Sequence, residues 1–203
     1  PVNENIKKKL IYFGRFNRHK NLKEFIQAYI EANLGKNWSF DIYGIDDDPD
    51  YKKELIKIAS MSDNQNPIRF LKPEFNVKKK YKIISESWCN VLLSKSEVLS
   101  LSVLEACSVG TQSLVNKKIF FPHWIKKNLI RSSLENANLV ANIKKIAQKS
   151  IGELKAKKKI VKKSFQDNYL FTVQKYKYKS FLEKTLKRSS NQNVLPGLLS
   201  ITA

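Results

Sequence analysis

The chain has 203 residues, of which 42% are hydrophobic, 11% aromatic and 28% charged, a composition that excludes a collagen-like, low-complexity or wholly disordered polypeptide. At this length about 70% of the unfolded surface can be buried, so one full-sized domain needs neither disulfides nor a metal for stability. The 38 Lys and Arg against 18 Asp and Glu give a net charge of +20, which favours acidic partners.

The cysteine pattern and the N-terminal residues indicate the compartment. Cys89 and Cys107 lie in apolar runs without CxxC or Cys/His spacing, which disfavours a zinc site and a secreted disulfide scaffold and indicates a reducing cytoplasm. No stretch reaches 18 apolar residues, and residues 1–9 lack the apolar core of a signal peptide. Because the first residue is Pro1, we expect a piece or a processed product of a longer chain.

Strand-like and helix-like segments alternate through the first part of the chain. Continuous apolar runs such as VLL and SLV are typical of strands buried on both faces. The pattern therefore predicts an α/β fold, with a Rossmann-like parallel sheet and helices on both faces. The expected strands are 9–14, 38–43, 68–71, 90–93 and 112–115, and the expected helices are 21–34, 51–61, 78–87 and 101–108, the last ended by Gly110.

After Phe120 the pattern becomes mostly helical, with amphipathic segments at 134–148, 153–165 and 169–188. We expect one domain over residues 1–188 with a helical C-terminal extension, followed by a loosely ordered tail over 189–203. Between residues 116 and 188 there are 20 Lys or Arg and only 4 acids, so 16 of the 20 excess charges lie there. Phospholipid, nucleic acid or a phosphorylated substrate would suit this segment.

The loop after the first expected strand begins with Gly14 and Arg15 and includes Lys20. In an open parallel sheet, ligands bind beyond the carboxyl ends of the strands, where helix N-termini attract anions. Cations around such a turn indicate a phosphate clamp, although in a chain of this charge they are also compatible with solvated surface residues. The glycines of a dinucleotide fingerprint or a Walker loop are missing.

Two glutamates, Glu97 and Glu105, flank the start of the expected helix 101–108. A carboxylate accepts hydrogen bonds from two vicinal hydroxyls, so an elongated ligand could place a diphosphate at the helix N-terminus and a polyol near each glutamate. The alternative is a surface glutamate followed by a helix glutamate paired with a lysine. On this spacing the carboxylates lie too far apart to act as an acid/base pair on one bond.

Four segments in order, GRFNRHKNL, FDIYG, IRFLKP and SEVLSLSVLEACSVGT, resemble the C-terminal, nucleotide-sugar-binding domain of GT-B glycosyltransferases of the group 1, or family 4, type. The resemblance runs from about residue 9 to residue 115. It implies one half of a GT-B fold, with the nucleotide-sugar donor as the ligand.

Carried over position by position, the resemblance implies that Arg15 and Lys20 bind the donor diphosphate. It implies that Glu97 is the catalytic residue, which contacts the transferred sugar, and that Glu105 contacts the ribose. The substrate-binding set implied by the resemblance is completed by Gly14, Val98, Leu99, Ser100 and Leu101.

The chain departs from the family pattern at two places. Val98 and Ser100 occupy positions where the family usually has glycines, so the close approach of the backbone to the sugar is in question. His123 stands about where a glutamate would be expected. These departures keep open a degenerate glycosyltransferase-like domain that binds no donor.

The resemblance implies a retaining transferase that moves a sugar to a glycan or lipid-linked acceptor without a metal or other cofactor, and the sequence shows no Asp/His/Glu metal-ligand cluster. Such enzymes hold the acceptor on an N-terminal domain. We expect the chain to lack this partner domain and to be inactive alone. The competing hypothesis is a basic module that uses residues 155–163 to bind an anionic membrane or, less plausibly, nucleic acid. Peripheral attachment to the inner face of a membrane is also compatible with the first hypothesis.

Overall fold

The computed structural model of the chain describes residues 5–62, 66–98, 100–170, 175, 179, 180 and 183. Its packing divides the chain into one unit of residues 1–165 and a second of residues 166–203. The expected domain end at residue 188 and the expected tail over 189–203 lie outside the described residues. Among the described residues, no helix is long and apolar enough to cross a membrane.

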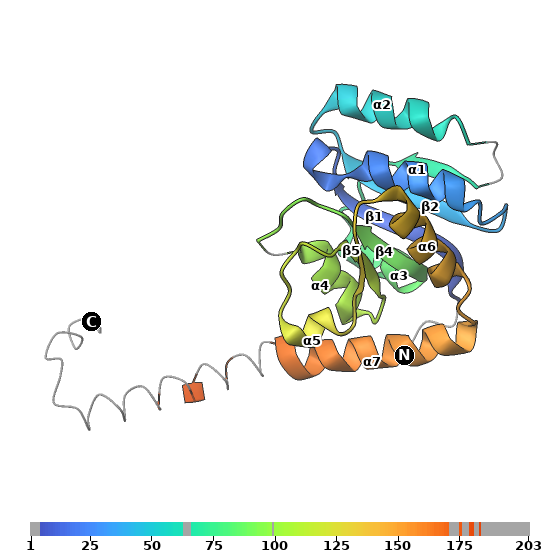
Figure 1. The fold of residues 1–203 in the computed structure, drawn as a ribbon. Helices are drawn as coiled ribbons and strands as arrows, with labels where there is room; N and C mark the ends of the chain where they lie inside the picture. Colours follow the sequence, from blue (N-terminus) through green and yellow to red (C-terminus); the bar gives the residue numbers. More distant parts are fainter. Residues whose placement is uncertain are drawn as a thin grey trace, which may run out of the picture. The chain divides into compact units, whose positions relative to one another are not determined.

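The first unit is built on a six-stranded sheet whose neighbouring strands all pair in parallel, which confirms the expected α/β class (Figure 1). The strand order is β3-β2-β1-β4-β5-β6, so the direction of winding reverses between β1 and β4. The strands are β1 (Lys7–Arg15), β2 (Ser39–Ile45), β3 (Ile68–Leu71), β4 (Ser87–Leu92), β5 (Ser113–Asn116) and β6 (Ile130–Ser132).

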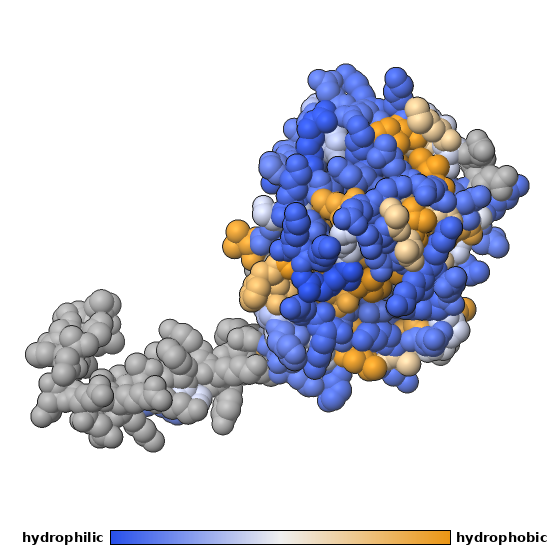
Figure 2. Space-filling view, in the orientation of Figure 1, coloured by the Kyte–Doolittle hydropathy of each residue, from blue (hydrophilic) through white to orange (hydrophobic). Residues whose placement is uncertain are grey.

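Helices cover both faces of the sheet, and the face of the molecule seen in Figure 2 is mostly hydrophilic with separate hydrophobic patches. The alternating side chains of β1 show that each face of the sheet has its own buried cluster. Leu10 and Tyr12 belong to the core cluster that includes α1, α2 and α6, whereas Ile11 and Phe13 pack in a separate cluster with residues of α3 and α4. The helices are η1 (Arg18–Lys20, a 3₁₀ turn), α1 (Leu22–Ala32), α2 (Pro49–Ala59), α3 (Val77–Ser85), α4 (Leu101–Ser108), α5 (His123–Lys126), α6 (Asn136–Ala147) and α7 (Ile151–Tyr169).

Local chemistry sets the N-termini of the helices that begin near the carboxyl edge of the sheet. At α2, the Asp48 carboxylate accepts the Tyr51 N–H at 2.9 Å, and Pro49 occupies the first turn. At α3, the Asn76 side chain accepts the Lys79 N–H at 3.0 Å. Because each loop ends at a defined cap, the helix N-termini are positioned at the edge where a ligand would enter.

Helix α7 is attached to the unit by a buried cluster, the α7 anchor, formed by Ser85, Gly110, Thr111 and Lys158. Lys158 is 1% exposed, and its ammonium donates to the Ser85 carbonyl at 2.9 Å and to Thr111 Oγ1 at 2.7 Å. Burial lowers the pKa of this lysine to about 8. Gly110 has φ +84°, and a Cβ there would lie 3.0 Å from the Lys158 carbonyl carbon.

Gly110 follows the end of α4, as predicted, but three other expectations were incomplete. The sixth strand, β6, and the short helix α5 were missed, because three and four residues are too few to show a period. The predicted interruption between helices 153–165 and 169–188 is wrong, since α7 continues to Tyr169 through polar residues 166–168. Most of the predicted helix 169–188 lies outside the described residues.

Candidate functional site

The direction of winding reverses between β1 and β4, and in open parallel sheets ligands bind beyond the carboxyl ends of the strands at such a reversal; we call this place the crevice. The loops that follow these two strands flank it. Residues 14–20 follow or end β1, and residues 93–100 connect β4 to α4. These are the two segments in which the sequence placed its candidate site.

Hydrogen bonds join the two loops directly. The buried side chain of Asn21 donates to the Leu93 carbonyl at 2.7 Å, and the Lys95 N–H donates to the His19 carbonyl at 2.8 Å. Asn21 has φ 50°, in the left-handed region that asparagine tolerates. The Asn116 side chain adds a bond from the end of β5 to the Ser94 carbonyl at 3.0 Å. The two walls of the crevice are therefore fixed to each other.

Gly14 lies against the ring of Tyr12, which is two residues earlier on the same strand. The Tyr12 hydroxyl donates to the Arg15 carbonyl at 2.8 Å, and a Cβ at position 14 would come within 2.8 Å of the ring carbon that bears this hydroxyl. Burial raises the pKa of Tyr12, and the negative charge of Glu97 raises it further. Tyr12 is therefore a neutral donor beneath the crevice, and Gly14 is needed for its position.

Lys20 and Glu97 form an ion pair across the crevice. The Lys20 ammonium lies 2.7 Å from Glu97 Oε1, and the Ser94 hydroxyl donates to the same oxygen at 2.6 Å. The two side chains are only 20% and 15% exposed. The structure thus brings together two of the predicted site residues, from positions 77 residues apart in the sequence.

Glu105 is paired with a residue that the sequence analysis missed. Lys80, on α3, donates to Glu105 Oε1 at 2.7 Å, and its ammonium lies 5.4 Å from the centroid of the Phe13 ring. The other carboxylate oxygen, Oε2, is buried and has no hydrogen-bond partner. The alternative anticipated from the sequence, a helix glutamate paired with a lysine, is therefore also realised at this position.

Arg15 does not join either pair. Its guanidinium lies 3.5 Å from Asp47 in the loop after β2, and the Asn17 side chain donates to the same carboxylate at 3.0 Å. The Arg15 side chain is 61% exposed. It lies at the predicted edge of the sheet and contributes positive charge there, but its contact is with the β2 loop.

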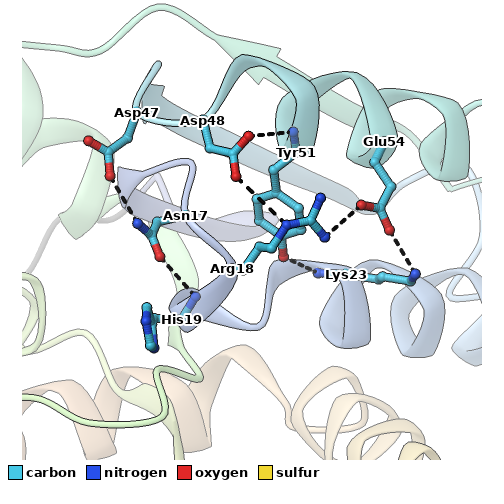
Figure 3. A network of polar contacts seen from close by, with 8 residues as sticks. All are labelled: Asn17, Arg18, His19, Lys23, Asp47, Asp48, Tyr51 and Glu54. Carbon is cyan, nitrogen blue, oxygen red and sulfur yellow. Dashed lines mark hydrogen bonds and ion pairs between the residues drawn. The ribbon is translucent and has the colours of Figure 1, made fainter.

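A polar network attaches the loop after β1 to α2 (Figure 3). Arg18 donates to Glu54 at 2.9 Å, and its guanidinium carbon lies 4.9 Å from the centroid of the Tyr51 ring. Lys23 donates to the same glutamate at 2.7 Å, and hydrogen bonds from Lys23 and Arg18 lower the pKa of Glu54. Arg18 therefore contacts α2, apart from Arg15 and Lys20, the two cations that the sequence assigned to the phosphate clamp.

The start of α4 shows how the missing glycines are accommodated. Ser100 caps the helix with φ −82°, outside the left-handed region, so a glycine is not required there. The Ser100 hydroxyl is buried without a hydrogen-bond partner. Val98 and Leu101 expose their side chains, whereas Leu99 lies outside the described residues.

The arrangement combines two functions at one edge. The positive end of α4 and the Lys20 ammonium can neutralise an anion. The carboxylates of Glu97 and Glu105 can accept hydrogen bonds from hydroxyls. Among the described residues, no group of three or more His, Cys, Asp or Glu side chains could hold a metal ion. The edge is therefore suited to a ligand that carries both phosphate and polyol groups.

The sheet order, the two helical layers and the crevice define a Rossmann-like α/β domain, the architecture of each half of a GT-B glycosyltransferase. The family model of the glycosyl transferases group 1 matches residues 2–171, and the chain belongs to this family. This result confirms the resemblance drawn from the sequence. A comparison with curated proteins finds no matching sequence.

Solved structures share the fold at low sequence identity. An α,α-trehalose-phosphate synthase (UDP-forming) from Burkholderia vietnamiensis superposes with a TM-score of 0.71 at 13% identity, over 91% of this chain and 45% of that one. The C-terminal domain of LpcC, a glycosyl transferase group 1 family protein from Francisella tularensis, gives 0.67 at 19%, over 82% and 89%. WaaG, a glycosyltransferase involved in lipopolysaccharide biosynthesis, gives 0.64 at 16%, over 86% and 46%. The chain thus spans about half the length of the synthase and of WaaG.

Proposed function

We propose that the chain is the donor-binding half of a glycosyltransferase that moves a sugar from a nucleotide sugar to an acceptor. Lys20 and the N-terminus of α4 bind the diphosphate, with Arg15 adding charge at the entrance. Glu97 contacts the transferred sugar, and Glu105 accepts hydrogen bonds from the ribose. A second, acceptor-binding domain completes the active site, so this chain alone binds the donor without transferring the sugar.

The observation that carries the proposal is the Lys20–Glu97 pair beside the N-terminus of α4. The Glu97 carboxylate occupies an acceptor position on the Lys20 ammonium that a phosphate oxygen can take. Phosphate is a strong acceptor for lysine, and the adjacent helix end favours the same negative charge. Exchange of partners then leaves Glu97 free to accept hydrogen bonds from the sugar.

Two finer points belong to the same proposal. The reaction retains the anomeric configuration, as the family resemblance implies. It proceeds without a metal or other cofactor, because lysine, arginine and a helix N-terminus supply the positive charge. Addition of EDTA should therefore leave donor binding unchanged, and a loss of affinity that Mg²⁺ restores would contradict this point.

We also propose a cytoplasmic location.

The test of donor binding is calorimetric titration of the chain with UDP, GDP, ADP and UDP-glucose at two salt concentrations. We expect one nucleotide to bind selectively. Lys20→Ala should weaken that binding by about 10- to 100-fold, because it removes a charged hydrogen bond to phosphate. Lys53→Ala is the matched control, since Lys53 lies on α2 with a side chain that is 78% exposed. Its effect should be less than about twofold.

Two outcomes would contradict the proposal. Equal, weak and salt-sensitive responses to all four ligands would indicate only a basic surface. If Lys20→Ala leaves selective binding unchanged, Lys20 does not bind the donor diphosphate. The first result would favour the degenerate domain, which has the fold of the family without its ligand.

We also propose peripheral attachment to an anionic membrane, as an accessory property. The observation that favours it is the outer side of α7, where Lys159 and Lys163 are exposed together with Ile160 at 54%. Exposed lysines near an anionic surface contribute about 1 kcal/mol each. Vesicles of phosphatidylcholine with 30% phosphatidylserine should retain the chain at low salt, and pure phosphatidylcholine vesicles should not. Equal retention by both would exclude this attachment.

A further inference from the structure

We infer that Lys80 is a positioning residue that orients the Glu105 carboxylate for hydrogen bonds to the ribose hydroxyls of the donor. The inference rests on the proposed function, because it assigns a role within the same site. No motif in the sequence points to Lys80. It lies on α3, 25 residues before Glu105, outside both loops of the crevice.

The two oxygens of Glu105 have different surroundings. Oε1 accepts from the Lys80 ammonium at 2.7 Å, whereas Oε2 is buried and has no hydrogen-bond partner. A buried carboxylate oxygen without a donor is unfavourable, because folding has removed its water without replacing it. The single ion pair fixes the rotation of the carboxylate. A ligand hydroxyl at Oε2 would supply the missing donor.

Lys80 is itself held in place, which a positioning role requires. Its ammonium lies 5.4 Å from the centroid of the Phe13 ring, a cation–π contact that adds to the ion pair. Phe13 in turn stacks on Tyr43, with ring centroids 4.6 Å apart. The Lys80 side chain is 25% exposed. The orientation of Glu105 is therefore fixed by α3 and by the ends of β1 and β2.

A nucleotide that lacks a ribose hydroxyl tests this arrangement. We would titrate the chain and its Lys80→Met variant with UDP, GDP and ADP, with the 2′-deoxy form of each, and with pyrophosphate. For the nucleotide that binds, the parent should prefer the ribose form by about tenfold, the value of one hydrogen bond to a charged acceptor. In Lys80→Met this preference should fall below about twofold, while the affinity for pyrophosphate stays within about twofold of the parent.

Two further variants separate positioning from folding. Lys80→Arg restores a cation and should restore most of the preference. Lys82→Met, on the same helix with a side chain that is 72% exposed, should leave the preference unchanged. In a Glu105→Gln background, where the preference is already reduced, Lys80→Met should cause no further loss, because the two residues act through one contact. Thermal unfolding of each variant confirms that the fold is retained.

The outcomes distinguish this inference from the proposed function. A parent that binds no nucleotide selectively overturns both. A parent that prefers ribose, together with a Lys80→Met variant that keeps this preference, overturns the role of Lys80 and leaves the donor site intact. An equal loss for the ribose form, the deoxy form and pyrophosphate would show that Lys80 contacts phosphate directly, and would also overturn the positioning role.

Discussion

The lysines at the carboxyl edge and the lysine of the α7 anchor differ in what they contact. Lys20 and Lys80 are partly exposed, and each binds a carboxylate at 2.7 Å. Lys158 is 1% exposed and donates to a carbonyl and a hydroxyl. A partly solvated ion pair can change partners at little cost, whereas a buried ammonium on neutral acceptors is fixed by the packing around it. The edge is therefore suited to exchange with a ligand, and the anchor to structure.

The largest effect should come from Gly110→Ala in the anchor. The left-handed φ costs an alanine about 1–2 kcal/mol, and overlap of its Cβ with the Lys158 backbone adds about 2 kcal/mol, so the free energy of unfolding should fall by about 3–4 kcal/mol. Gly35→Ala is the control, because Gly35 has φ +86° but nothing within 4 Å of its Cβ position. It should lose only the cost of the left-handed φ, about 1–2 kcal/mol, in the same denaturant titration.

Equal losses at positions 110 and 35 would mean that the Lys158 backbone moves away readily. The packing of the α7 anchor would then be no more rigid than the carboxyl edge of the sheet.

The next effect is the pH dependence of Lys158→Met. The folded pKa of about 8 is below the unfolded value of 10.5, so the unfolded state binds more protons between these pH values. The stability of the parent relative to the variant should therefore rise by about 3 kcal/mol from pH 8 to pH 10.5, and stay constant below pH 8. Cys89 interacts with Lys158, but burial raises the pKa of its thiol to about 12, so the thiol stays protonated across this range in both folded proteins and its contribution cancels in the difference.

Denaturation of both proteins at several pH values gives this difference directly. A flat difference across the range would show that Lys158 titrates normally, and that its burial is not what separates it from the edge lysines.

The smallest effect on stability should come from Lys20→Ala. Exposed ion pairs contribute under about 1 kcal/mol, and breaking a fully buried pair costs about 3–5 kcal/mol. The Lys20 and Glu97 side chains are 20% and 15% exposed, so the free energy of unfolding should fall by an intermediate amount of about 1–2 kcal/mol. The same variant is expected to lose most of the nucleotide affinity, which separates function from stability at this edge. A loss of several kcal/mol in the denaturant titration would place Lys20 with the structural lysine.

Much of the fold could be predicted from local patterns. Apolar runs and their helical periods located the five strands that lie between Lys7 and Asn116, and the four helices between them. Gly110 marked the end of α4 because its positive φ is a local requirement. Strand β6, with three residues, carries no such pattern and depends on its pairing with β5.

The sequence predicted which loops form the candidate site, but not which side chains contact each other there. The two loops were located by the rule that ligands bind at the carboxyl edge. The ion-pair partners of the charged residues could not be predicted. Lys80 pairs with Glu105 because α3 packs against α4, and Arg15 pairs with Asp47 in the loop after the neighbouring strand β2. Contacts of this kind depend on tertiary geometry, which spacing along the chain does not contain.

The bonds between the two loops determine what a ligand must order when it binds. Because Asn21 is bonded to Leu93 and Lys95 to His19, the backbone at these positions is already constrained before a ligand arrives. Ordering a free segment would oppose binding by about 1–2 kcal/mol for each residue. At the bonded positions this entropic penalty is already met by the fold, so a larger share of the free energy of the contacts with the ligand is expressed as affinity.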